Sequence, residues 1–162
     1  MRIASVILML LLAISGCAVY TFSSSALGGV KTIAIPEFEN RTTQFDIDVL
    51  TTEELNQAFV RDNTLKVMPL DQADAVLTGA ITSYSHDPYT FDASEQVQEY
   101  IVRIILSVQV QRANSDKVFW KDDNLSDYGV YSVVDGETQD DGNRRAIQKL
   151  VDEILNRTVR GW

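Results

Sequence analysis

The chain has 162 residues, with 14 Lys and Arg against 23 Asp and Glu, and its formal net charge is -9 at pH 7. This acidic balance argues against a nucleic-acid ligand, because affinity for phosphate backbones comes from clustered basic residues. Cys17 and His86 are the only cysteine and histidine, so the sequence offers no His or Cys pair for a zinc site. With no disulfide possible within the chain, packing alone must stabilise the fold.

Residues 1–16 have the order of a secretory signal, in which a positive charge precedes an apolar run and small residues. The run is about a dozen residues long, shorter than the ~20 that a membrane-spanning helix needs. The four residues at its end resemble the bacterial lipobox: Ile14, Ser15, Gly16 and Cys17. We expect cleavage between Gly16 and Cys17, and acyl chains such as palmitate on Cys17 that anchor the chain to a membrane. The alternative is an ordinary signal followed by a buried free cysteine.

The segment after the signal divides into a tether, residues 17–30, and a single domain, residues 31–162. The domain opens with an expected strand over residues 30–38, in which Ile33 and Ile35 are buried.

An amphipathic helix is expected from Phe45 to about Asn63. Its predicted buried stripe is Phe45, Val49, Thr52, Leu55 and Phe59. Residues 65–70 form the next expected strand. A strand, a helix and a strand in this order predict a right-handed crossover with two parallel strands.

The second half of the chain alternates apolar and polar residues in the manner of antiparallel strands. We expect strands at 76–86, 100–111 and 117–122, with a polar connection over 87–96. The strongest of them should bury Tyr100, Val102, Ile104, Leu106, Val108 and Val110. A last helix from Asp141 should bury Ile147, Leu150, Val151, Ile154 and Thr158. The element order predicts an α+β fold, with one mixed sheet and both helices on a single face.

The sequence contains no catalytic constellation, and we expect a non-enzymatic protein without cofactor or metal. His86, beside Asp87 and Pro88, is interpreted as a surface residue at a strand end, with a catalytic role as the alternative. The acidic run 135–143 lacks the ligand spacing of an EF-hand and is interpreted as a solvated loop. Five aromatic residues near strand ends fit either the rim of the core or an interface: Tyr84, Tyr89, Phe91, Tyr128 and Tyr131.

Four segments, "KTIAIPEFENRTTQ", "LTGAITSYSHDPYTFD", "VFWKDDNLSDYGVYS" and "NRTVRGW", resemble the LptE family of outer-membrane lipoproteins. The likeness runs from Cys17 to Trp162. It implies a two-layer sandwich of two helices on a four-stranded sheet, inside the lumen of an LptD β-barrel. It also implies a lipid-anchored protein on the periplasmic side of the outer membrane that helps to deliver lipopolysaccharide to the outer leaflet.

The resemblance further implies contact with lipopolysaccharide through basic residues. The candidates are those on or near the long hairpin: Arg103, Arg112, Lys117 and Lys121. Ordinary solvated charges are the alternative. A rival function also stays open, because "IAIPEFENRT" resembles the first strand and loop of curli-type secretion lipoproteins and of TolB-like N-terminal domains. That likeness predicts a periplasmic envelope scaffold without a role in lipopolysaccharide transport.

Replacing Cys17 with serine tests the lipid anchor, because a hydroxyl cannot take the place of the thiol that carries the diacylglyceryl group. We expect Cys17→Ser to release the domain into the soluble periplasmic fraction, or to accumulate as a precursor with its signal attached. Membrane fractionation and the mass of the N-terminal peptide measure the result. Normal processing together with unchanged membrane attachment would contradict the prediction.

Overall fold

The computed structural model describes residues 27–161. The predicted signal, the lipobox with Cys17, and most of the tether lie outside the described residues. The elements in chain order are β1 (Thr32–Ala34), β2 (Glu39–Asn40), α2 (Ile47–Asp62), β3 (Lys66–Val67), the 3-10 helix η2 (Leu70–Gln72), β4 (Ala75–Phe91), β5 (Val97–Arg112), β6 (Val118–Ser132) and α3 (Gln139–Arg160).

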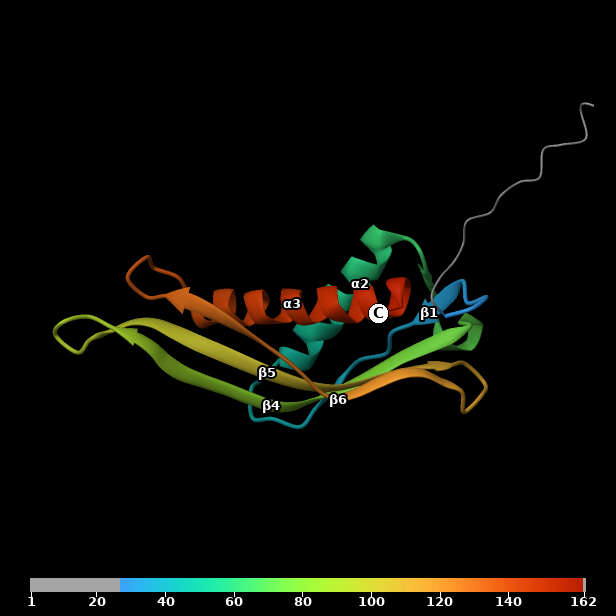
Figure 1. Cartoon of the computed structure of the whole chain (residues 1–162), viewed down its shortest axis with the longest axis horizontal. Coiled ribbons are helices and arrows are strands. Elements are labelled where there is room, and N and C mark those ends of the chain that lie inside the picture. The colour runs from blue at the N-terminus through green and yellow to red at the C-terminus, as the bar shows by residue number, and fades with distance from the viewer. Residues whose placement is uncertain (1–26, 162) are drawn as a thin grey trace, which may run out of the picture.

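Within residues 27–161 the strands form one mixed sheet of six, in the order β3-β1-β4-β5-β6, with β2 paired to β4. Strand β1 runs parallel to β3 and β4, whereas β4, β5 and β6 are antiparallel neighbours. Figure 1 shows α2 and α3 on the same side of the sheet. The α+β fold is confirmed, but the expected four strands are too few. Strand β2 pairs only Glu39 and Asn40 with β4, which is too short to leave a period in the sequence.

Helix α2 buries a different face from the predicted one. Leu55 and Phe59 are buried as expected, but Phe45 and Val49 are 86% and 49% exposed. Asp46 has a φ of 58°, in the left-handed region, and turns the chain just before the first helical residue. Phe45 therefore lies outside the helix. The residues that α2 buries are Ile47, Thr51, Leu55, Ala58 and Phe59.

Strand β4 is longer than its sequence predicts, because it continues through the expected polar connection to Phe91. The connection to β5 is a short turn closed by the Asp92 N–H, which donates to Gln96 O at 2.9 Å. Pro88 lies in the part of β4 that pairs only with β5, a position where a strand tolerates a residue without an N–H. Strand β6 also extends beyond residue 122, and Tyr131 pairs with Tyr100.

The core lies between the sheet and the two helices, and its central predictions are confirmed. Five alternating residues of β5 are at most 1% exposed: Val102, Ile104, Leu106, Val108 and Val110. All five predicted residues of the α3 stripe are buried: Ile147, Leu150, Val151, Ile154 and Thr158. Leu27 and Val30, assigned to the tether, are buried as well. The boundary between tether and domain at residue 31 stays a prediction.

Helix α3 approaches β6 very closely where Gly142 meets Gly129. A Cβ atom at Gly129 would overlap the Gly142 carbonyl oxygen, and a Cβ at Gly142 would lie 2.8 Å from Tyr131 Cδ1. Neither position has room for a larger side chain without a shift of the backbone or of the Tyr131 ring. The two glycines thus allow the N-terminal half of α3 to pack directly on β6.

The two faces of β5 predict opposite responses to truncation. Leu106→Ala removes a fully buried side chain and should lower the free energy of unfolding by about 2–5 kcal/mol. Gln109→Ala, on the opposite face, should change it by less than about 0.5 kcal/mol. Urea unfolding followed by circular dichroism measures both values. Equal losses for the two variants would refute this assignment of the faces.

Candidate functional site

The sheet face that the helices leave open carries hydroxyl and amide side chains together with apolar ones such as Ile101, Ile105 and Val130. Ser107 Oγ donates to Asp123 Oδ1 at 2.9 Å, and Gln109 Nε2 donates to Gln111 Oε1 at 2.7 Å. The register of the three long strands places these residues on the face: Thr78, Ser83, Ser85, Ser107, Gln109, Gln111, Lys121 and Ser126. This open face is a surface that can exchange hydrogen bonds with a polar partner.

The four predicted basic residues do not form one cluster. Arg103 and Lys121 lie on the open face, separated along the strands by about 20 Å at ~3.3 Å per residue. Arg112 and Lys117 lie beside the β5–β6 turn, where their charged groups are 5.7 and 5.5 Å from the centre of the Phe119 ring. The structure therefore brings together only Arg112 and Lys117. Their contact with lipopolysaccharide stays a prediction.

An aromatic cluster lies under the N-terminal end of α3. His86 Nε2 is 2.7 Å from Tyr131 Oη, and the rings of His86 and Tyr100 are 4.9 Å apart. The Tyr84 hydroxyl donates to Asn143 Oδ1 at 2.9 Å, and burial raises the pKa of Tyr84, so the phenol stays protonated. His86 is exposed, as expected, but it lies within β4 and not at a strand end.

The five predicted aromatic residues fall into two groups. Tyr84 and Tyr131 belong to this cluster at the rim of the core, where Gln139 Nε2 also donates to Tyr84 Oη at 2.7 Å. The other three are exposed: Tyr89, Phe91 and Tyr128. The core-rim interpretation is confirmed for Tyr84 and Tyr131, whereas the interface interpretation of the three exposed residues stays a prediction.

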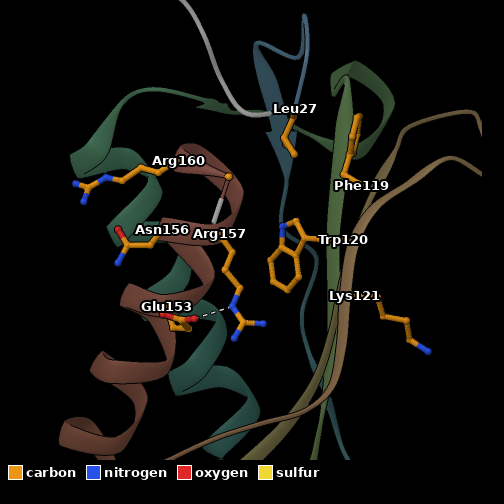
Figure 2. A pocket seen from close by; sticks show the side chains of 9 residues that line it. Leu27, Phe119, Trp120, Lys121, Glu153, Asn156, Arg157 and Arg160 are labelled. Atoms are coloured by element: carbon orange, nitrogen blue, oxygen red, sulfur yellow. Dashed lines mark hydrogen bonds and ion pairs between the residues drawn. The ribbon is translucent and has the colours of Figure 1, made fainter.

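A pocket of about 880 Å³ lies between the C-terminal end of α3 and the start of β6 (Figure 2). Trp120 Nε1 is buried, with no hydrogen-bond partner among the described residues. Arg157 donates to Glu153 at 2.6 Å and to Asp122 at 2.8 Å, and these bonds raise the pKa of Arg157. The acidic partners offset the Arg157 charge, so this guanidinium does not mark an anion site. The pocket is lined by Leu27, Phe119, Trp120, Lys121, Glu153, Asn156, Arg157, Arg160 and Gly161.

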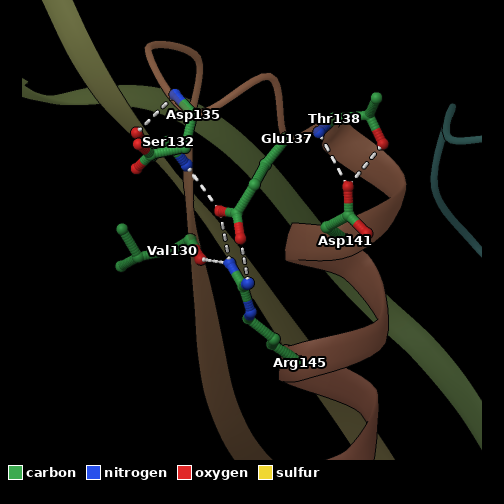
Figure 3. A network of polar contacts seen from close by, with 7 residues as sticks. All are labelled: Val130, Ser132, Asp135, Glu137, Thr138, Asp141 and Arg145. Carbon is green, nitrogen blue, oxygen red and sulfur yellow. Dashed lines mark hydrogen bonds and ion pairs between the residues drawn. The ribbon is translucent and has the colours of Figure 1, made fainter.

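A polar network closes the outer edge of β6 (Figure 3). Arg145 Nη1 donates to Val130 O at 2.5 Å and to Glu137 Oε2 at 2.8 Å. Glu137 also accepts from the Ser132 N–H at 2.8 Å, and the Arg145 hydrogen bonds are the main reason that the pKa of Glu137 falls to about 2. Lys149 Nζ donates to the Tyr128 carbonyl oxygen of the same strand edge at 2.7 Å. These side chains occupy backbone groups that another strand would need for pairing.

Sequence reasoning missed both the Trp120 pocket and this network. The residues of the network come from β6, the following loop and α3, so no single period of the sequence connects them. The sequence predicts a strand at Trp120, but the opposing wall of its pocket belongs to the last turns of α3. A turn signal followed by the pair Thr138 and Asp141 could have marked the helix start, since these two residues form a capping box.

Between residues 27 and 161, no three or more His, Cys, Asp or Glu residues are grouped so that they could hold a metal ion. No helix in that part of the chain has the length and apolarity to cross a membrane. What the structure presents is a set of hydrogen-bonding and aromatic surfaces on a two-layer α+β domain. Such surfaces are suited to binding another molecule.

Comparison with protein families assigns the chain to a class. A family model described as lipopolysaccharide-assembly, LptE, matches residues 30–158. The chain therefore belongs to the LptE family. A search among curated proteins finds no significant match.

Solved structures share the fold at low sequence identity. Protein XCC0632 from Xanthomonas campestris has a TM-score of 0.55 at 11% identity, over 81% of this chain and 84% of that one. The hypothetical protein CT253 from Chlamydia trachomatis has a TM-score of 0.54 at 11% identity, over 78% and 96%. A PelC dodecamer from Paraburkholderia phytofirmans has a TM-score of 0.51 at 13% identity, over 80% of this chain and 89% of that one. At these identities the likeness concerns the fold alone.

The Glu137 pKa predicts a pH-dependent contribution to stability. Because folding lowers this pKa from 4.5 to about 2, the contribution is present above pH 4.5 and is lost as the pH falls toward 2. Glu137→Gln should therefore melt below the wild type at pH 7, and the difference should shrink in acid. Thermal unfolding at a series of pH values measures it.

Glu95→Gln is the matched control, because it removes the same charge from the exposed β4–β5 turn. Its melting temperature should follow that of the wild type at each pH. A constant difference between Glu137→Gln and the wild type from pH 7 to 2.5 would contradict the assignment to Glu137.

Proposed function

We propose that this chain is a lipid-anchored outer-membrane lipoprotein that plugs an LptD-like β-barrel, supports its assembly and helps to deliver lipopolysaccharide. The observation that carries the proposal is the family match over residues 30–158. In this proposal the protein is a binding partner and not a catalyst. The acyl groups on Cys17 hold it at the periplasmic side of the membrane.

The open face of the sheet supports a place inside a barrel. The lumen of a transmembrane barrel is polar, so a domain that fits into it needs a surface of hydrogen-bonding groups. Three neighbouring strands carry such hydroxyl and amide groups on this face. They belong to Thr78, Ser107, Gln109, Gln111 and Ser126. A wholly apolar face would leave the polar groups of the lumen without hydrogen-bond partners.

The length of the sheet is also compatible with a barrel. Strands β4 and β5 have 17 and 16 residues. At ~3.3 Å per residue they extend about 50–55 Å, whereas the hydrocarbon core of a bilayer is about 30 Å thick. In Figure 1 the hairpin of these strands continues past the N-terminal end of α3. The hairpin is therefore long enough to reach through a barrel of membrane height.

Within this proposal, direct contact with lipopolysaccharide is best assigned to Arg112 and Lys117. Their charged groups lie 5.7 and 5.5 Å from the centre of the same Phe119 ring, so both positive charges are available at this turn to an anionic phosphate group. Arg103 and Lys121 are separate charges on the open face, and Lys121 is paired with Asp123 at 2.8 Å.

A self-assembling envelope scaffold is the second candidate function. The specific observation in its favour is that a structure with the same fold is described as a dodecamer of PelC. A ring would use contacts between copies of the domain and would need no barrel. The two functions differ in what copurifies with the protein.

Copurification from detergent-solubilised outer membranes tests the proposal. We expect the tagged protein to carry one large β-barrel protein in equal amount, identified by mass spectrometry. Depletion should lower the level of that barrel and make the cells permeable to bulky hydrophobic antibiotics. A homo-oligomeric ring, with barrel assembly and the permeability barrier intact after depletion, would replace this function by the scaffold.

A further inference from the structure

Phe45 is the most exposed large apolar residue in the described part of the chain, at 86%. It lies immediately before Asp46 and α2. An exposed aromatic side chain is a common anchor in protein interfaces, where a few such residues supply most of the affinity. A single exposed residue is not sufficient evidence, so its support and surroundings decide the inference.

The loop that carries Phe45 is held by side-chain hydrogen bonds. Asn40 Oδ1 accepts from Thr42 N and Thr42 Oγ1 at 2.9 and 2.8 Å, and Asn40 Nδ2 donates to Gln44 O at 2.7 Å. Thr42 Oγ1 in turn accepts from Gln44 N at 3.2 Å. Gln139 of α3 donates to Gln44 Oε1 at 3.3 Å, which joins the loop to the second helix. The chain segment that leads into Phe45 is therefore held by hydrogen bonds within the loop and to α3.

The residue after Phe45 takes an uncommon backbone conformation. Asp46 has a φ of 58°, and the next residue, Ile47, is 1% exposed. The bend at Asp46 thus separates a buried isoleucine from an exposed phenylalanine. Because the backbone that displays Phe45 is already ordered, binding through this residue requires little further ordering of the backbone.

The surroundings of Phe45 combine apolar and acidic groups. A groove of about 510 Å³ next to it is lined by Val49 and by three exposed acidic residues, Asp46, Glu53 and Asp140. Arg144 is the one basic residue among those lining the groove, and its Nη1 lies 3.7 Å from Glu54. The charge around the aromatic anchor is therefore predominantly negative.

We infer that this Phe45 surface, formed by Phe45, Asp46, Val49, Glu53 and Asp140, docks on a folded protein whose apolar pocket takes one aromatic ring and is rimmed by Lys or Arg. The partner is the β-barrel of the proposed function, on which this inference rests. Charge complementarity selects such a partner, because the acidic rim repels the anionic groups of a lipid surface. It also disfavours a second copy, whose identical acidic patch would face this one.

The test compares Phe45→Ser with Val60→Ser. Val60, at 64% exposure, lies near the other end of α2 and provides a matched loss of an exposed apolar side chain. Both variants should keep the wild-type melting temperature. Capture of the barrel should fall by about tenfold or more for Phe45→Ser, as for an interface anchor, and stay unchanged for Val60→Ser.

Photocrosslinking identifies the partner at this surface. Benzoylphenylalanine at position 45 should crosslink the barrel in cells, whereas the same residue at position 60 should not. Glu53→Lys should also weaken capture, because it reverses a charge that faces the basic rim. Crosslinks from position 45 to a second copy or to lipid would overturn the inference.

The outcomes separate this inference from the proposed function. If the wild type captures a barrel and Phe45→Ser captures it equally well, the docking surface is wrong and the proposed function stands. If the wild type captures no barrel, both are overturned.

Discussion

The contact between Gly129 and Gly142 determines how the rest of the described domain is arranged. A Cβ atom at Gly129 would overlap the backbone of α3, so the helix can lie this close to β6 only because Gly129 has no side chain. This close approach places Tyr131 over Gly142 and brings Asn143 within hydrogen-bond distance of Tyr84. The core under α3 is therefore defined by backbone contact as much as by apolar side chains.

The same contact also decides which surfaces remain available to a partner. With α3 this close, Arg145 and Lys149 reach the outer carbonyl groups of β6 and prevent pairing with another strand there. The helices cover one face of the sheet. The open face, the Trp120 pocket, the Phe45 surface and the β5–β6 turn with Arg112 and Lys117 stay exposed on the described domain.

The sequence predicted the elements whose side chains follow one strict period. Strand β5 and helix α3 each have one buried face, and every residue assigned to those faces by period is buried or half-buried. Sequence period could not reveal β2, which pairs over two residues, or the second half of β4, whose polar and proline residues are tolerated because that half pairs with β5 alone. The edge network and the Gly129 contact join residues from separate elements, so they depend on the tertiary fold.

The wrong prediction for Phe45 has a particular physical meaning. Sequence period placed an aromatic residue at the start of α2 in the core, which is the ordinary location for it. In the structure Ile47 occupies the core instead. The left-handed Asp46 and the hydrogen-bonded loop before it keep Phe45 outside the core. Local preference and global fold disagree here, and in natural proteins such disagreements concentrate where function requires them. Phe45 is exposed to solvent on an ordered loop with acidic neighbours. Binding of a partner explains this exposure more simply than folding does.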